Sequence, residues 1–306
     1  NMVVPSIMSV VMMSLDVVFN FFLIFPTRPV QLFGAEVTIP GMGMGVVGAA
    51  IGTVSAELVA ASITMYILCF RSKELSLRID TGRFLPTWGV VKRALHISLP
   101  MGLQQTIMCS AYVMTTIIIA PLGTFAIAAN SFGVIVESLC YMPGYGIADA
   151  ATTLVGQSIG AGRHELMKRF AWLSVGLGVT VMAVMGVVMY VGAPVAMAMM
   201  TPAEEVRRLG VEVLRIEAFA EPMFAAAIVS YGVFVGAAKT LVPSIMNLVS
   251  IWGVRISLAA LLAPSMGLRG VWIAMCIELC FRGFIFLVKL KFWNIQTSCN
   301  HYGKDQ

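Results

Sequence analysis

The chain is organised as long apolar runs separated by short polar segments. Each run has roughly the 20 residues that a helix needs to cross the hydrocarbon layer of a bilayer. Such runs lie near residues 2–25, 45–70, 94–120, 124–156, 168–199, 210–236, 240–263 and 268–292. This pattern predicts an all-α, polytopic membrane protein with eight transmembrane helices.

The fourth run leaves the number of crossings open, because residues 124–160 have room for one long helix or two short ones. At 1.5 Å per residue the segment measures about 55 Å as a helix. The sequence Pro143-Gly144-Tyr145-Gly146 interrupts it. The lengths of the apolar runs alone do not decide between the two arrangements.

The distribution of cationic residues favours one kinked helix at 124–160. With a single crossing there, thirteen lysines and arginines fall on one side, and the other side holds Arg28, Arg207, Arg208 and Arg269. The positive-inside rule places the richer side in the cytoplasm. We therefore expect residues 71–93, 157–169 and the tail after 289 to be cytoplasmic, and 26–43 and 200–208 to face outward. Both ends of the chain are then cytoplasmic.

The composition excludes an ordinary soluble protein. Hydrophobic residues make up 59% of the chain and charged residues 11%, whereas soluble domains carry about 25% charged residues. The mean hydropathy is +0.90. The net charge of +5 lies in the breaks between apolar runs, so it indicates membrane topology rather than nucleic-acid binding. The six cysteines form no C-x-x-C pair and the three histidines lie far apart, so we expect mostly buried free thiols, no metal site and no cofactor.

Two short patterns occur twice in the same order. Pro5-Ser6-Ile7-Met8 recurs as Pro243-Ser244-Ile245-Met246, and Met44-Gly45-Val46-Val47-Gly48 parallels Met266-Gly267-Leu268-Arg269-Gly270. Six spans separate the copies, so we infer a six-helix repeat and a complete protein of twelve helices, with four helices before residue 1. Parallel repeats of this kind are typical of secondary transporters.

The repeat suggests a division of the chain into three parts. Residues 1–93 form the end of an N-terminal lobe, with two helices and a cytoplasmic inter-lobe loop. Residues 94–294 form a complete six-helix C-terminal lobe. Residues 295–306 form a cytoplasmic tail.

Several motifs in a fixed order along nearly all of residues 1–294 resemble the multidrug and toxin extrusion (MATE) transporters. Leu99-Pro100-Met101-Gly102-Leu103-Gln104-Gln105 opens one span and Pro121-Leu122-Gly123 closes it. Ala126-Ile127-Ala128-Ala129-Asn130 opens the next span, which ends in Leu154-Val155-Gly156-Gln157-Ser158-Ile159-Gly160-Ala161-Gly162. Gly236-Ala237-Ala238-Lys239-Thr240 stands where the family has a glycine-rich turn, and Gly270-Val271-Trp272 matches its last helix.

The resemblance implies a two-lobe MATE-type transporter of twelve helices, of which this chain supplies helices 5–12. It implies secondary active multidrug efflux, in which cationic or amphipathic organic compounds leave in antiport with H+ or Na+ by alternating access between the lobes. We expect a monomer in the bacterial inner membrane, the plasma membrane of the cell. Its partners would be drug-like small molecules and the lipid bilayer, with no nucleic acid.

The coupling ion stays open because the sequence departs from the family pattern. The helix at 94–120 lacks the glutamate that sodium-coupled members often carry there. The family's usual aspartate in the helix at 210–236 has no clean match, and the nearby acids are Glu217 and Glu221. The acid that many members use for protons belongs to the family's first helix, which this chain does not contain.

Three glutamates lead the candidates for an ion or substrate site, because an ionisable group at membrane depth is costly. Glu137 lies deepest and shares a helix face with Asn130; it either lines a cavity or makes a packing contact. Glu217 and Glu221 are four residues apart and are expected on one helix face. They cannot both ionise cheaply in a low-dielectric site, so one of them could carry a transported proton. Alternatively, both continue the solvated charged stretch that precedes them.

Uncharged and paired polar residues form the second group of candidates. Asp16 and Asn20 are an i, i+4 pair in the first helix, and either line the cavity or pack. A stripe made of Gln104, Gln105 and Tyr112 could bind a cationic drug or join helices. A separate set is expected to form structural ion pairs: Arg255, Glu278 and Arg282.

Two other functions compete with export. Exporters of lipid-linked oligosaccharides, or flippases, share a repeated helical architecture, but they line their cavities with several cations. Gly156-Gln157-Ser158-Ile159-Gly160 fits the nucleophile elbow of serine hydrolases, although it ends a membrane helix instead of joining a strand to a helix. A membrane-embedded hydrolase is therefore a remote alternative. The sequence predicts a transporter and not an enzyme.

Overall fold

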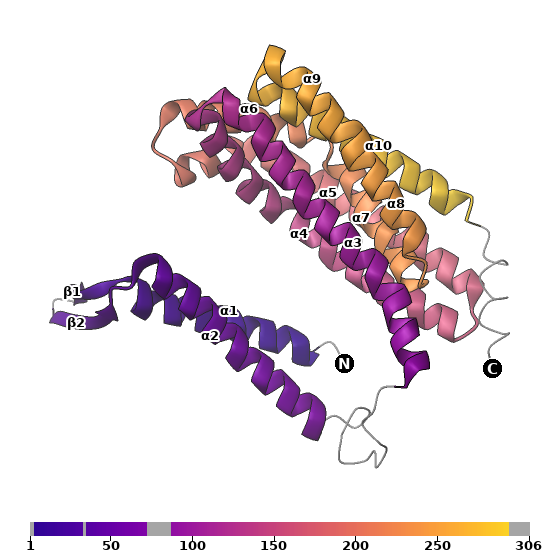
Figure 1. Ribbon diagram of the computed structural model, residues 1–306, viewed down its shortest axis with the longest axis horizontal. Coiled ribbons are helices and arrows are strands. Elements are labelled where there is room, and N and C mark those ends of the chain that lie inside the picture. The colour runs from indigo at the N-terminus through magenta and orange to yellow at the C-terminus, as the bar shows by residue number, and fades with distance from the viewer. Residues whose placement is uncertain (1–2, 33–34, 72–86, 294–306) are drawn as a thin grey trace. The chain divides into compact units, whose positions relative to one another are not determined.

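The computed structural model describes residues 3–32, 35–71 and 87–293. The chain divides into two compact units, Asn1–Pro86 and Thr87–Gln306, each of which is described by itself. Figure 1 labels the helices and strands of both.

The first unit is a helical hairpin joined by a β-hairpin. Helix α1 spans Val3–Ile24 and α2 spans Gly45–Tyr66, and α2 continues into a π-helical turn, η1, at Ile67–Arg71. The buried positions of α2 are all small residues, Gly48, Gly52, Ala56 and Ala60. Small residues let two membrane helices approach closely. A Cβ at Gly48 would lie 2.5 Å from the carbonyl oxygen of Leu23, so α1 and α2 pack backbone against backbone there.

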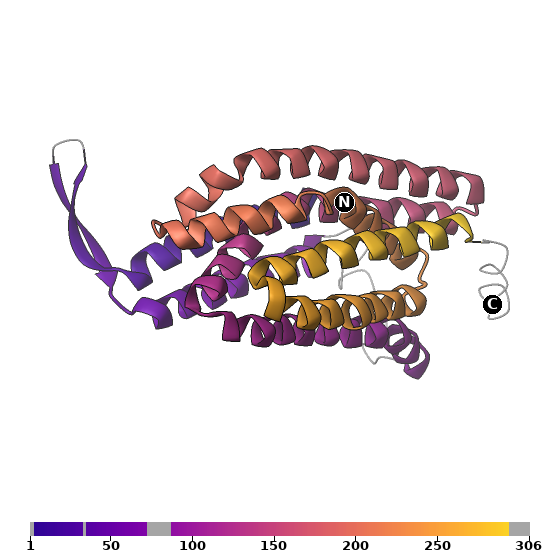
Figure 2. The ribbon, with the colours of Figure 1, turned by 90° about the horizontal axis from the view of Figure 1, so that it is seen from above.

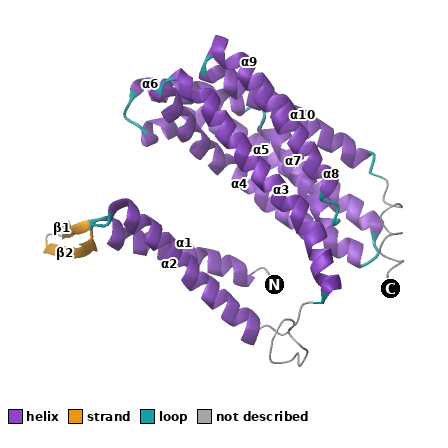
Figure 3. Cartoon of the chain, in the orientation of Figure 1, coloured by secondary structure: helices purple, strands orange, loops and turns teal. Residues whose placement is uncertain are grey.

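The connection between α1 and α2 is a β-hairpin. Strands β1 (Pro26–Leu32) and β2 (Ala35–Met42) form an antiparallel hairpin with Val30 paired with Val37. Figure 3 shows these strands within an otherwise helical described chain. β-Branched residues favour strands, but strands of seven and eight residues are too short to stand out as apolar runs of spanning length.

The second unit is a bundle of helices that run roughly along a common direction (Figure 2). Its elements in order are α3 (Trp88–Ile119), a 3-10 turn η2 (Ala120–Leu122), α4 (Thr124–Gly160), α5 (His164–Met200), α6 (Glu204–Glu217), α7 (Glu221–Gly236), α8 (Leu241–Val249), a π-helical segment η3 (Ser250–Ile256), α9 (Ser257–Met266) and α10 (Leu268–Lys291).

The eight predicted spans are confirmed. Seven helical segments of the described chain are long and apolar enough to cross a membrane, and α6 with α7 makes an eighth if this bent pair is one span. Helix α4 runs unbroken from Thr124 to Gly160 with Pro143 inside it, so the prediction of one helix rather than two in this segment is confirmed. One boundary was wrong, because α3 begins at Trp88 and not near residue 94.

The turns at one end of the bundle use left-handed backbone. Gly162 has φ +68° and ends the α4–α5 turn, where the amide of Arg163 donates to the carbonyl of Ser158 at 2.9 Å. Ala238 in the α7–α8 turn has φ +54°. The amide of Lys239 donates there to the carbonyl of Phe234 at 2.9 Å. A side chain in this conformation is strained, which explains why a glycine is typical at such helix ends.

The core of the bundle lies among α4, α5, α7 and α10. Trp272 and Phe286 of α10 are buried, with exposed fractions of 1% and 0%. Helices α4 and α7 touch at Gly232, where the hydroxyl of Thr152 donates to the Gly232 carbonyl at 2.8 Å. Large apolar side chains such as Leu173 and Val195 are 67% and 65% exposed on α5. An apolar exterior of this kind suits contact with lipid tails rather than water.

Candidate cation site at a broken helix

The span at 204–236 is broken in its middle. Helix α6 ends at Glu217 and α7 begins at Glu221, and the two helix axes are bent by 60°. The amide of Ala220 donates to the carbonyl of Glu217 at 2.8 Å and closes the turn between them. Pro222 lies in the first turn of α7, where its missing N–H group costs nothing. The expectation of one continuous helix at 210–236 was therefore wrong.

Both glutamates at the break are buried. Glu217 and Glu221 are each 1% exposed, and none of their four carboxylate oxygens has a hydrogen-bond partner within the described chain. They flank the turn between two helices instead of sharing one helix face, yet they interact electrostatically. A buried carboxylate without a partner is costly. The break is therefore a place where a proton, a cation or a cationic ligand would be stabilised.

Helix α5 holds the break from one side through a glycine. A Cβ added at Gly186 would lie 2.7 Å from the carbonyl oxygen of Ala218 and 3.3 Å from the Cβ of Glu221. Only a residue without a side chain allows the α5 backbone to approach the turn this closely. Gly186 does not stand out in the sequence, because glycines are common throughout the apolar runs.

Glu137 adds a third carboxylate from α4. It is 7% exposed and interacts electrostatically with both Glu217 and Glu221. Asn130, expected on the same face, accepts a hydrogen bond from the indole N–H of Trp272 at 3.1 Å. Its amide therefore joins α4 to α10. The structure brings together the three glutamates that the sequence singled out, from three different helices.

An ion-pair cluster lies beside these carboxylates and contains the predicted pairs of Arg255, Glu278 and Arg282. Nη2 of Arg255 lies 2.9 Å from Oε2 of Glu278, and Nε of Arg282 lies 3.1 Å from Oε1. The hydroxyl of Ser250 donates to Oε1 at 2.6 Å. Ser250 and Arg255 both belong to the π-helical segment η3. Such segments occur frequently at functional sites.

The charges of the two groups do not balance. Glu137 and Glu217 both interact with Arg255, and Arg282 also acts on Glu137. Two guanidinium groups face four buried carboxylates, including Glu278. If every carboxylate were ionised, two negative charges would be left without compensation.

The polar stripe of α3 is divided by the structure. Oε1 of Gln104 accepts hydrogen bonds from Tyr231 at 3.0 Å and from Ser244 at 2.5 Å, which connects α3 to α7 and α8. Gln105 and Tyr112 are exposed on the second unit, and Tyr112 is 54% exposed. The sequence did not point to Tyr231 or Ser244, because hydroxyl groups are frequent in apolar spans.

Asp16 and Asn20 lie on α1 in the first unit. Both side chains are half-buried, and one oxygen of each, Oδ1, is buried without a hydrogen-bond partner among the described residues. The amide of Asn20 lies against Gly52 of α2, where a Cβ would clash with its oxygen.

Ser158, the serine of the G-x-S-x-G pattern, has a structural role. The hydroxyl of Ser158 donates to the carbonyl of Leu154 at 2.7 Å inside α4. The G-x-S-x-G pattern is therefore the last part of a helix and not a nucleophile elbow.

The five cysteines within the described residues are free thiols, and Cys109 is exposed, contrary to the expected burial. Cys299 lies outside the described residues. No group of three potential ligands that could hold a metal ion was found in the described part of the chain.

Known proteins resemble this chain in sequence and in fold. A family model described as MatE matches residues 100–261. A "probable multidrug resistance protein NorM" of Thermotoga maritima is 28% identical over 250 residues, covering 80% of this chain and 53% of that protein. A protein of the same name from Xylella fastidiosa is 29% identical over 238 residues, covering 77% of this chain and 50% of that protein. The chain thus spans about half the length of these curated relatives.

Solved transporter structures share the fold. The Vibrio cholerae MATE transporter VcmN in its bent form superposes with a TM-score of 0.78 at 18% identity, covering 95% of this chain and 62% of that one. A transporter of the MOP superfamily from Pyrococcus furiosus gives a TM-score of 0.80 at 19% identity, covering 93% and 61%. That structure's description suggests a different function for it from the reversed polarity of its binding pocket.

Proposed function

Because the chain belongs to the MatE family of membrane transporters, we propose that the full-length protein exports cationic or amphipathic organic compounds in antiport with H+ or Na+. It would act in the bacterial inner membrane, as a monomer, by alternating access between two six-helix lobes. Drug-like small molecules are the expected substrates. The lobe boundaries at residues 93 and 294 and the cytoplasmic tail remain part of this proposal.

The observation that carries the proposal is the group of buried glutamates at the α6–α7 break. Discontinuous helices are typical of the substrate and ion sites of secondary transporters. Ionisable residues inside a membrane protein mark proton relays and ion pathways. The buried and unpaired carboxylates of Glu217 and Glu221, with Glu137 nearby, combine both features. We assign the coupling cation and the positive charge of the substrate to this site.

The charge balance indicates how many cations the site could hold. The two uncompensated negative charges would be neutralised by two protons or by two monovalent cations. A transported organic cation would replace part of this charge. Competition of this kind is what an antiporter needs, because a carrier that bound both ligands together would dissipate the gradient.

The polarity of the site favours organic cations over lipid-linked oligosaccharides. A flippase cavity needs free positive charge for a pyrophosphate group. Arg255 and Arg282 are already paired with Glu278, and the guanidinium group of Arg215 stacks 5.2 Å from the ring centroid of Tyr190. All three of these arginines are thus engaged, whereas the buried carboxylates of Glu217 and Glu221 have no hydrogen-bond partner among the described residues.

The arrangement of the bundle supports the proposed sidedness. Lys168 near the start of α5 and Lys291 at the end of α10 line one pocket. Phe234, near the α7–α8 turn, packs on Trp293 with ring centroids 5.1 Å apart. The α4–α5 turn, the α7–α8 turn and the end of α10 therefore lie at one end of the second unit. Each has a lysine in or near it, namely Lys168, Lys239 and Lys291. This is the end that the positive-inside rule assigns to the cytoplasm.

Transport by the purified full-length protein in liposomes tests the proposal. A fluorescent organic cation would be loaded, and its movement followed under an imposed proton gradient and, separately, an imposed sodium gradient. We expect gradient-driven movement of the cation under at least one of them, and little movement of an organic anion of similar size. Movement of the anion with no movement of the cation would contradict the assignment.

A further inference from the structure

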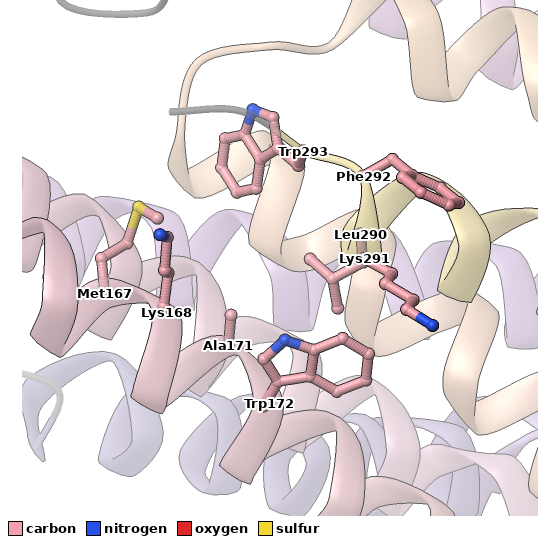
Figure 4. Close-up of a pocket in the computed structure, with 8 residues that line it drawn as sticks. All are labelled: Met167, Lys168, Ala171, Trp172, Leu290, Lys291, Phe292 and Trp293. Carbon is pink, nitrogen blue, oxygen red and sulfur yellow. The ribbon is translucent and has the colours of Figure 1, made fainter. Parts of the chain in front are cut away.

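A pocket unrelated to the glutamate site lies between the start of α5 and the end of α10. Its volume is about 370 Å³. Figure 4 shows Lys168, Ala171 and Trp172 coming from α5, and Leu290, Lys291 and Trp293 coming from the end of α10. The glutamate site lies at the opposite end of α7, since Glu221 begins that helix.

Two cationic side chains give the pocket its charge. The ammonium group of Lys168 lies 3.9 Å from Glu165, and both side chains of that pair are mostly exposed. Exposed pairs at this spacing contribute little. Lys291 has no ion-pair partner in the part of the chain that the structure describes. The pocket therefore offers nearly uncompensated positive charge to a ligand.

The other walls of the pocket are apolar and aromatic. Ala171 and Leu290 are buried, and Trp172 is 46% exposed. Leu173, the next residue, is 67% exposed and continues the apolar surface of α5 into the span. Tryptophan and lysine together are enriched where a membrane helix meets the lipid headgroups. The pocket thus has a cationic part beside an apolar surface that can contact acyl chains.

We propose that this pocket binds the phosphate headgroup of an anionic membrane phospholipid. Lys168 and Lys291 contact the phosphate oxygens, while Trp172 and Trp293 lie at the level of the glycerol backbone. Basic pockets between transmembrane helices bind anionic headgroups by the same combination of charges and shape. A soluble phosphate ester would satisfy the lysines but would leave the exposed apolar wall of α5 uncovered.

Native mass spectrometry of the full-length protein tests this proposal. The protein would be titrated with phosphatidylglycerol, with phosphatidylcholine, and with soluble glycerol 3-phosphate. We expect phosphatidylglycerol to bind best. In the double variant Lys168→Gln/Lys291→Gln its affinity should fall about thirtyfold, the factor expected when two basic residues are lost near an anionic surface.

A charge-matched control separates the pocket from the general surface charge. Lys239 and Lys289 are exposed and do not line the pocket. Lys239→Gln/Lys289→Gln should therefore retain nearly full phosphatidylglycerol binding. Equal losses in both double variants, or equal binding of phosphatidylcholine, would overturn the proposal. Binding of glycerol 3-phosphate as strong as that of the lipid would overturn the assignment to a lipid. All four substitutions lie on exposed side chains, and a melting curve of each variant would verify folding.

Discussion

Glu217 is the last residue of α6 and Glu221 is the first residue of α7, so four positions along the chain separate two buried carboxylates on helices bent by 60°. Neither carboxylate has a hydrogen-bond partner in the described structure. A structural ion pair of this protein looks different, since Glu278 contacts Ser250, Arg255 and Arg282. The carboxylates at the break therefore offer negative charge without a partner.

The approach of α5 to the break predicts the effect of a single methyl group. Gly186→Ala would place a Cβ 2.7 Å from the Ala218 carbonyl oxygen, and overpacking of this kind costs about 1–3 kcal/mol. We expect the break to shift and the rate of cation transport in liposomes to fall severalfold. Gly192→Ala on the same helix is the control, because a Cβ there meets nothing within 4 Å. Equal transport by both variants would show that the contact at Gly186 is not needed.

The ion-pair cluster predicts a loss of stability when Glu278 is neutralised. Glu278→Gln leaves Arg255 and Arg282 nearly buried without their counter-charge, and breaking a buried pair costs about 3–5 kcal/mol. The yield of folded protein and its melting temperature should both drop. Glu212→Gln breaks the more exposed ion pair between Glu212 and Arg269 and should cost at most about 1 kcal/mol. A stable Glu278→Gln protein with normal yield would contradict a structural role for the cluster.

Strain in the α7–α8 turn predicts a stabilising substitution. Ala238 has φ +54°, a conformation that costs an L-residue roughly 1–2 kcal/mol and glycine much less. Ala238→Gly should therefore raise the free energy of unfolding by up to about 1 kcal/mol, after the added entropy of the unfolded chain is subtracted. Ala237→Gly, at φ −87°, should stabilise nothing and lower the free energy of unfolding slightly. Thermal melting in detergent measures both, and a lower melting temperature for Ala238→Gly would refute the strain.

The proposed topology predicts which engineered cysteines an impermeant thiol reagent reaches in intact cells. In a cysteine-free background, Ala203→Cys lies in the α5–α6 turn and Ala161→Cys in the α4–α5 turn, and both positions are exposed. Position 203 should react with the reagent, and position 161 should react only after the membrane is permeabilised. The reverse pattern would invert the orientation.

The length of the apolar runs was sufficient to predict the eight spans, because a spanning helix needs about 20 apolar residues whereas a strand of a membrane β-barrel needs only about 9–11. Charge parity also decided that α4 crosses once. The break after Glu217 was harder to predict, because Arg215 and Glu217 look like the solvated beginning of one continuous helix that runs on to residue 236. The available signals were Pro222 and the change from the charged residues of α6 to the apolar run of α7.

The partners of the candidate residues were not predictable from one sequence. The hydrogen bonds that hold Gln104 and Asn130 come from residues more than 120 positions away, Tyr231 and Trp272 among them. The spacing of residues on one helix gives a face but not the neighbour that covers it. For the same reason Gly186 could not be distinguished from glycines that meet only lipid.

Competition between the coupling cation and the substrate at Glu221 most directly tests the assignment of cation binding to the α6–α7 break. Binding of a fluorescent organic cation to the full-length protein would be measured by titration at several proton concentrations and, separately, at several sodium concentrations. The wild-type protein should bind the dye more weakly as the competing cation increases. In Glu221→Gln, which keeps the size but removes the negative charge, dye binding should be weaker and nearly independent of that cation, at normal expression. An unchanged affinity with the same dependence on protons or sodium in Glu221→Gln would contradict the assignment of cation binding to the α6–α7 break.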